Sequence, residues 1–190
     1  MKEKNALLKK LPSSGAVYGI LLFVIIFSMV IPGYFTIHNI SNIARQSAVL
    51  CFISMCSCLA ILTNQTDLSC GAISGFAACV AAKAMNSGCS ILVGCLIGLL
   101  MAMIIGAING ILAGYTEIPT FIITLATMNI SRGLARVMVN NKTVAVNNSI
   151  YKFIGTGYVG PIPVHIIFIL IVIIITAIIL TRTSFGRSIY

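Results

Sequence analysis

Long apolar runs alternate with short polar breaks along the whole chain. A run of about 17 to 25 mostly apolar residues can cross roughly 30 Å of hydrocarbon as a helix, and a helix satisfies its own backbone groups there. The pattern therefore predicts an all-α, polytopic membrane bundle in which residues 1–190 form a single transmembrane domain. The six predicted spans cover residues 15–31, 47–63, 68–85, 91–115, 119–139 and 163–180.

Three intervening segments have predicted roles of their own. Residues 37–46 mix polar and apolar positions and are expected to lie at the membrane interface as a connector. Residues 64–67 form a polar break, and residues 140–160 form a longer polar loop. Pro119 suits the first turn of the fifth span.

Small residues recur at every fourth position of the fourth span. Four residues advance a helix by about 400°, so this ladder drifts around the helix by about 40° per step and can serve more than one neighbour. Small residues let helix backbones approach closely in a membrane, which predicts a packing role and a central helix. The ladder consists of Gly94, Gly98, Ala102, Gly106, Gly110 and Gly114.

The composition excludes a soluble globule. The 190 residues are 59% hydrophobic and 8% charged, with a mean hydropathy of +1.09, so they cannot supply a polar surface. The net charge of +9 is scattered along the chain and does not predict a nucleic-acid partner. The seven cysteines lie in apolar runs without CxxC spacing, and His38 and His165 lack nearby ligand partners, so no metal or cofactor is expected.

The basic residues indicate the orientation of the bundle. Six spans place both termini on one side, and basic clusters near the two ends make that side cytoplasmic, with an uncleaved first helix in a cytoplasmic membrane. These clusters are Lys2, Lys4, Lys9, Lys10, Arg182 and Arg187. Six other basic residues fall toward the opposite side, so the orientation rests on the terminal clusters: Arg45, Lys83, Arg132, Arg136, Lys142 and Lys152.

Asp67 is the only aspartate and lies between two apolar segments. An ionised carboxylate at the bilayer centre costs about 2.5 to 3.5 kcal/mol, so it needs water, a helix end or a ligand. One interpretation is an N-cap for a helix that begins at Leu68, and the other is direct lining of a solute path. The two are compatible, because transporters present polar groups at the ends of discontinuous helices.

Other polar residues at membrane depth have structural and functional interpretations. Asn109, Thr124, Thr127 and Asn129 are expected by default to form hydrogen bonds between helices. Arg132 and Arg136 share a helix face, where their side chains can reach the headgroups of membrane lipid, and Arg132 could instead point into the bundle. The candidates for a solute path are Asp67, Ser69, Asn109, Thr124 and Arg132.

No motif for catalysis is present. The sequence contains no phosphate-binding P-loop, no HExxH, no GxSxG and no close acidic pair, so the chain is not expected to be an enzyme. If the function uses energy, a partner must supply it.

The order of several short landmarks resembles the membrane permeases of ribose-type ABC sugar importers. The landmarks run from the first span to the last residue, so the resemblance covers nearly the whole chain. They are YFTIHNISNI at 34–43, ILT at 61–63, DLSCG at 67–71, NG at 109–110, PTFIITL at 119–125, SRG at 131–133 and TSFGRSIY at 183–190.

The resemblance implies a transport subunit with several partners. These are a cytoplasmic ATPase that drives transport, an extracytoplasmic sugar-binding protein that delivers a monosaccharide such as ribose, and a second permease copy or a homologue. Asn64-Gln65-Thr66 stands where the family usually has a glycine-rich lead into Asp-Leu-Ser. Family members also continue beyond Tyr190 into an ATPase-docking segment and further spans, which implies a fragment or a truncated product here.

Two other functions compete with a sugar permease. A non-transporting remnant or membrane interaction protein would use the glycine ladder to associate with partners. An ion-coupled transporter would need charged residues buried at mid-membrane, and Asp67 is the single candidate.

Overall fold

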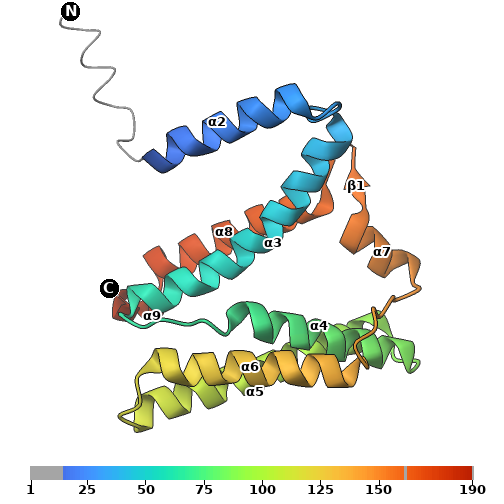
Figure 1. Cartoon of the computed structure of the whole chain (residues 1–190). Helices are drawn as coiled ribbons and strands as arrows, with labels where there is room; N and C mark the ends of the chain where they lie inside the picture. Colours follow the sequence, from blue (N-terminus) through green and yellow to red (C-terminus); the bar gives the residue numbers. More distant parts are fainter. Residues whose placement is uncertain (1–14, 161, 190) are drawn as a thin grey trace, which may run out of the picture. The chain divides into compact units, whose positions relative to one another are not determined.

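The computed structural model describes residues 15–160 and 162–189 (Figure 1). The basic cluster between Lys2 and Lys10 therefore lies outside the described residues. The described chain divides into two compact units, one ending at Ala44 and the other beginning at Arg45. The helices and strands are α2 (Gly15–Val30), α3 (Ile37–Leu62), α4 (Cys70–Asn86), α5 (Ile91–Tyr115), α6 (Thr120–Met138), α7 (Ser149–Thr156), β1 (Tyr158–Val159), β2 (Ile162–Pro163), α8 (Val164–Arg182) and α9 (Ser184–Ile189).

A helix occupies each of the six predicted spans, and the all-α prediction is confirmed. The predicted span 91–115 coincides with α5, and Pro119 stands at the N-cap of α6. Among the described residues, α3, α5 and α8 are long and apolar enough to cross a membrane by themselves. The shorter α2 is also apolar, and the number of crossings stays a prediction.

The segment 37–46, predicted as an interfacial connector, is helical, and its place at the membrane interface stays a prediction. These residues are the first part of α3, which begins at Ile37. Thr36 starts the helix because its Oγ1 accepts a hydrogen bond from the Asn39 backbone N–H at 3.3 Å, and the Asn39 side chain donates to the Tyr34 carbonyl at 2.7 Å. These polar side chains therefore cap the start of a helix that continues through the predicted second span.

The predicted loop at 140–160 also contains regular structure. Asn148 caps α7, because its Oδ1 accepts from the backbone N–H groups of Ile150 and Tyr151 at 2.9 and 3.3 Å. The strands β1 and β2 pair in antiparallel fashion, with Val159 opposite Ile162. This two-residue ladder is short enough to leave the fold class unchanged.

Three helices end in the same way, with a residue in the left-handed region. Asn64, Gly88 and Asn140 have φ values of 59°, 100° and 51° after α3, α4 and α6. After α3, the N–H of Asn64 donates to Ile61 at 2.9 Å and the N–H of Gln65 donates to Ala60 at 3.0 Å. This is the Schellman arrangement, which satisfies the last carbonyls of a helix.

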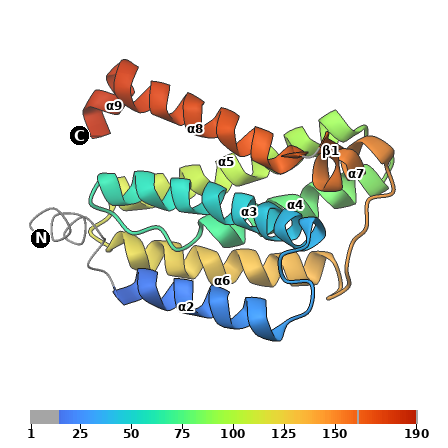
Figure 2. The same ribbon diagram turned by 90° about the horizontal axis from the view of Figure 1, so that it is seen from above.

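The helices α4, α5 and α6 pack against one another (Figure 1), and Figure 2 shows the same three helices from above. Close approach of α4 and α5 depends on two rungs of the glycine ladder. A Cβ at Gly98 would lie 2.7 Å from the Ala77 carbonyl oxygen, and one at Gly94 would lie 2.5 Å from Met85 Cγ. A Cβ at Gly106, Gly110 or Gly114 would meet nothing within 4 Å. Only the first part of the ladder therefore packs closely within the described chain, and the packing role of its later members stays a prediction.

The three packed helices α4, α5 and α6, with the turn before α4, bury hydroxyl groups and expose apolar side chains. The largest fully buried side chains are those of Ser69, Thr124 and Ser131. On α5, by contrast, Leu92 is 70% exposed and Leu99 is 56% exposed. Soluble proteins show the opposite distribution, so this pattern is that of an integral membrane protein.

Gly98→Ala should destabilise the packing of α4 against α5, because the added methyl group would meet backbone that cannot rotate away. Overpacking of this kind costs about 1 to 3 kcal/mol. We expect a lower thermal unfolding midpoint in detergent, followed by circular dichroism. Gly114→Ala is the matched control, since its Cβ has open space, and an equal loss in both variants would contradict this packing.

Candidate functional site

The polar segment between α3 and α4 folds around the carboxylate of Asp67. Its Oδ1 accepts hydrogen bonds from the Ser69 backbone N–H at 2.7 Å and from Ser69 Oγ at 2.6 Å. Its Oδ2 accepts a weaker bond from the Cys70 thiol at 3.2 Å. The predicted helix start at Leu68 is therefore wrong, because α4 begins at Cys70 and its N-cap residue is Ser69. Asp67 instead organises the turn that leads into the helix.

A chain of hydrogen bonds joins this turn to α5 and α6. Asn109 on α5 donates from Nδ2 to Ser69 Oγ at 3.1 Å. Thr127 on α6 donates from Oγ1 to Asn109 Oδ1 at 2.6 Å. Every bond therefore runs in one direction, from Thr127 through Asn109 and Ser69 to Asp67. Such a chain polarises its members toward the charged end and strengthens each bond.

Thr124 makes a second connection between α6 and the same turn. Its hydroxyl lies within 3.3 Å of the Thr66 carbonyl oxygen and 3.0 Å of the Thr120 carbonyl oxygen. The side chain is only 2% exposed. Its hydroxyl has one acceptor in the backbone of the break and another in its own helix. Thr124 therefore binds the backbone of the break to α6, in addition to the side-chain bonds that run through Asn109.

A cavity of about 180 Å³ lies beside this network. Asp67, Asn109 and Thr124 line it, so three of the predicted site residues are brought together. Gly106 and Gly110 contribute open backbone on α5, where a Cβ would have no neighbour within 4 Å. The full lining is Ala60, Gln65, Asp67, Ile73, Gly106, Asn109, Gly110, Ala113, Thr120 and Thr124.

The other two predicted site residues lie elsewhere. Ser69 is fully buried and contacts the cavity residues through hydrogen bonds without lining the cavity itself. Arg132 lies with Arg136 in a different groove of about 280 Å³ between α4 and α6. The structure therefore separates Arg132 from the cavity beside Asp67.

Two cavity residues, Gln65 and Thr120, were not among the sequence candidates. Thr120, Thr124 and Thr127 follow one another at spacings of four and three, which places them on one face of α6. That spacing is a sequence feature from which Thr120 could have been found. Gln65 has no comparable pattern, because its position depends on the turn after α3.

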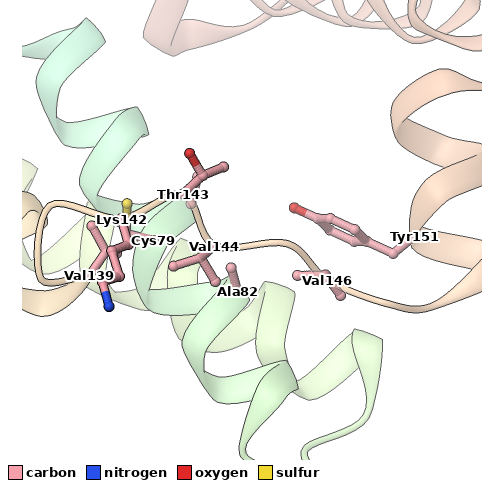
Figure 3. Close-up of a pocket in the computed structure, with 9 residues that line it drawn as sticks. Cys79, Ala82, Val139, Lys142, Thr143, Val144, Val146 and Tyr151 are labelled. Carbon is pink, nitrogen blue, oxygen red and sulfur yellow. The ribbon is translucent and has the colours of Figure 1, made fainter.

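A larger cavity, of about 290 Å³, lies at the C-terminal ends of α4 and α6 (Figure 3). Tyr151 of α7 projects toward the segment that carries Thr143 and Val144, while the Lys142 amine lies away from Tyr151 (Figure 3). The lining is mostly aliphatic and includes none of the predicted site residues. In the described part of the chain, no group of three His, Cys, Asp or Glu side chains could hold a metal ion.

A family model described as "Branched-chain amino acid transport system / permease component" matches residues 39–190. The chain belongs to this permease family. The chain is 38% identical over 179 residues to the D-allose transport system permease protein of Escherichia coli. It is 32% identical over 175 residues to the ribose import permease protein of Haemophilus influenzae, which confirms the resemblance to ribose-type permeases. It is also 29% identical over 176 residues to an autoinducer 2 import system permease protein of Photorhabdus laumondii.

The match covers most of this chain and about half of each relative. The aligned share of this chain is 93%, 90% and 92% for the allose, ribose and autoinducer 2 proteins, against 55%, 54% and 53% of the relatives. The chain thus spans about half the length of these curated relatives. No solved structure matches it.

Ser69→Ala should destabilise the protein, because it removes the link between Asp67 and Asn109 and leaves buried polar atoms unpaired. The expected cost is about 1 to 3 kcal/mol, read as a lower unfolding midpoint in detergent. Ser74→Ala is the matched control on the same helix, since Ser74 is exposed and donates only to the Gly71 carbonyl at 2.9 Å. Equal midpoints for the two variants would show that Ser69 carries no such link.

Proposed function

We propose that this chain is a transmembrane permease subunit of an ABC importer that carries a monosaccharide across the cytoplasmic membrane. A separate cytoplasmic ATPase supplies the energy, an extracytoplasmic binding protein delivers the sugar, and a second permease copy or homologue completes the pathway. Family membership and the similarity to the allose and ribose proteins support this proposal. Within it, residues 1–190 form one transmembrane domain with both termini in the cytoplasm.

The observation that carries the proposal is the set of free hydrogen-bonding groups beside the cavity. Asp67 Oδ1 already accepts two hydrogen bonds, while Oδ2 accepts only the thiol of Cys70. Asn109 donates one amide hydrogen to Ser69 and keeps a second. The cavity thus offers a strong acceptor and a donor, and a sugar hydroxyl can satisfy both.

The charge of the cavity favours a neutral solute. Asp67 is its one ionisable lining residue, so an anion would be repelled in a low-dielectric setting. A polyhydroxylated neutral molecule can instead donate to the carboxylate and accept from the amide. Asp67, Asn109 and Thr124 are therefore proposed to contact the solute, with Ser69 as the residue that positions the first two.

The break between α3 and α4 suits a transport pathway. Residues 65–69 form neither helix nor strand between α3 and α4, and Gln65 and Asp67 of this segment line the cavity. Discontinuous helices of this kind form solute sites in many transporters. The cavity of about 180 Å³ is smaller than the roughly 300 to 1,000 Å³ of typical ligand sites. We therefore expect further walls to come from elsewhere in the assembled importer.

Asp67→Asn should reduce sugar uptake while the protein remains in the membrane, because the amide keeps the shape and loses the charge. A hydrogen bond to a charged group contributes about 1.5 to 3 kcal/mol, so the loss should be roughly tenfold or more. The measurement is uptake of labelled ribose and allose in cells that lack the chromosomal copy. Immunoblotting of membranes reports the amount of each variant.

Thr63→Val is the matched control for Asp67→Asn, because Thr63 is exposed and its hydroxyl donates only to the Ala60 carbonyl.

Two further measurements separate the proposal from its competitors. Uptake that survives collapse of the proton gradient at constant ATP supports the ABC importer over an ion-coupled carrier. Failure of the unaltered chain to restore uptake, together with failure to co-purify with the ATPase, would favour a non-transporting membrane protein.

A further inference from the structure

The groove that contains Arg132 and Arg136 has two different surfaces. Its volume is about 280 Å³, and its lining on α4 consists of small residues and one aromatic ring. A Cβ at Gly75 would meet nothing within 4 Å, so the floor of the groove is open. The lining from α4 is Gly71, Ala72, Gly75 and Phe76. The groove is thus apolar along α4 and basic along α6.

The two arginines lie one turn apart, and no acidic residue of the described chain is within reach. Both are exposed, and Asp67 and Glu117 are the acidic residues among those described. Glu117 precedes α6, and Arg132 lies about 18 Å along that helix from its first residue. Asp67 is held near the level of Thr124 on α6, about 12 Å along the helix from Arg132.

The pair lies near the C-terminal end of α6. Arg136 lies about 3 Å before the end of α6 and Arg132 about 9 Å before it, by the rise per residue of a helix. In a membrane protein, guanidinium groups require a counter-charge or water. A phosphate matches the forked donors of arginine, and an apolar chain matches the floor at Gly75.

We propose that this groove is a binding site for an anionic phospholipid. Its phosphate pairs with Arg132 and Arg136, and one acyl chain lies in the groove along Gly75 and Phe76. The site is separate from the cavity beside Asp67 and does not depend on the solute. It places a lipid against α6, one of the two helices that hold the break between α3 and α4.

The test measures retention of dioleoyl phosphatidylglycerol by the purified full chain in detergent, with dioleoyl phosphatidylcholine as the neutral lipid. Arg132→Gln combined with Arg136→Gln should weaken phosphatidylglycerol binding by roughly 30-fold, since each basic residue near an anionic surface contributes about fivefold. Arg182→Gln is the matched control, because it removes an exposed charge from α8. It should leave binding unchanged.

A second variant tests the acyl-chain part without removing charge. Gly75→Leu fills the floor of the groove and should also weaken phosphatidylglycerol binding. This variant can still test the proposal if the double arginine variant fails to fold. Equal binding of the two lipids, or unchanged binding in Gly75→Leu and in a folded double variant, would overturn the proposal. Full displacement of the lipid by millimolar inorganic phosphate would overturn it as well and would indicate a site for the free anion.

Discussion

The hydrogen-bond chain from Thr127 to Asp67 is the interaction on which the rest of the site depends. It joins the break between α3 and α4 to α5 and α6 through two side-chain bonds of 3.1 and 2.6 Å. In the apolar interior of a membrane protein, the carboxylate and the non-helical backbone of the break need hydrogen-bond partners from the protein. Asn109 is suited to this role because an amide donates and accepts at once. The same partners leave one carboxylate oxygen and one amide hydrogen free beside the cavity.

The glycines of α5 have two different roles near this site. Near its start, Gly94 and Gly98 allow the middle and the C-terminal part of α4 to approach closely. Further along, Gly106 and Gly110 have open space and line the cavity on either side of Asn109. One sequence pattern of small residues therefore supports helix packing at one end and a solute cavity at the other.

Much of the fold could be predicted from apolar run length, as α5 shows by its coincidence with residues 91–115. Helix α7 was missed because its eight residues are far fewer than a membrane span needs, so apolar run length could not reveal it. Asp67 and Asn109 were recognised as polar residues at membrane depth, but their connection through Ser69 depends on packing between helices. Asn64 stands in the segment where a glycine-rich lead was expected, and it adopts the left-handed conformation at φ 59° that glycine would supply. The sequence alone therefore did not show that Asn64 could take the place of a glycine in the turn after α3.

The central claim is that Asn109 and Thr127 act as one unit, and a double-mutant cycle tests it most directly. Asn109→Leu, Thr127→Val and the combined variant would be compared by the free energy of unfolding in detergent. A linked pair predicts a coupling energy of about 0.5 to 3 kcal/mol, because either single change already breaks the bond. Additive effects, within about 0.3 to 0.5 kcal/mol, would show that the two side chains act independently and would contradict the account.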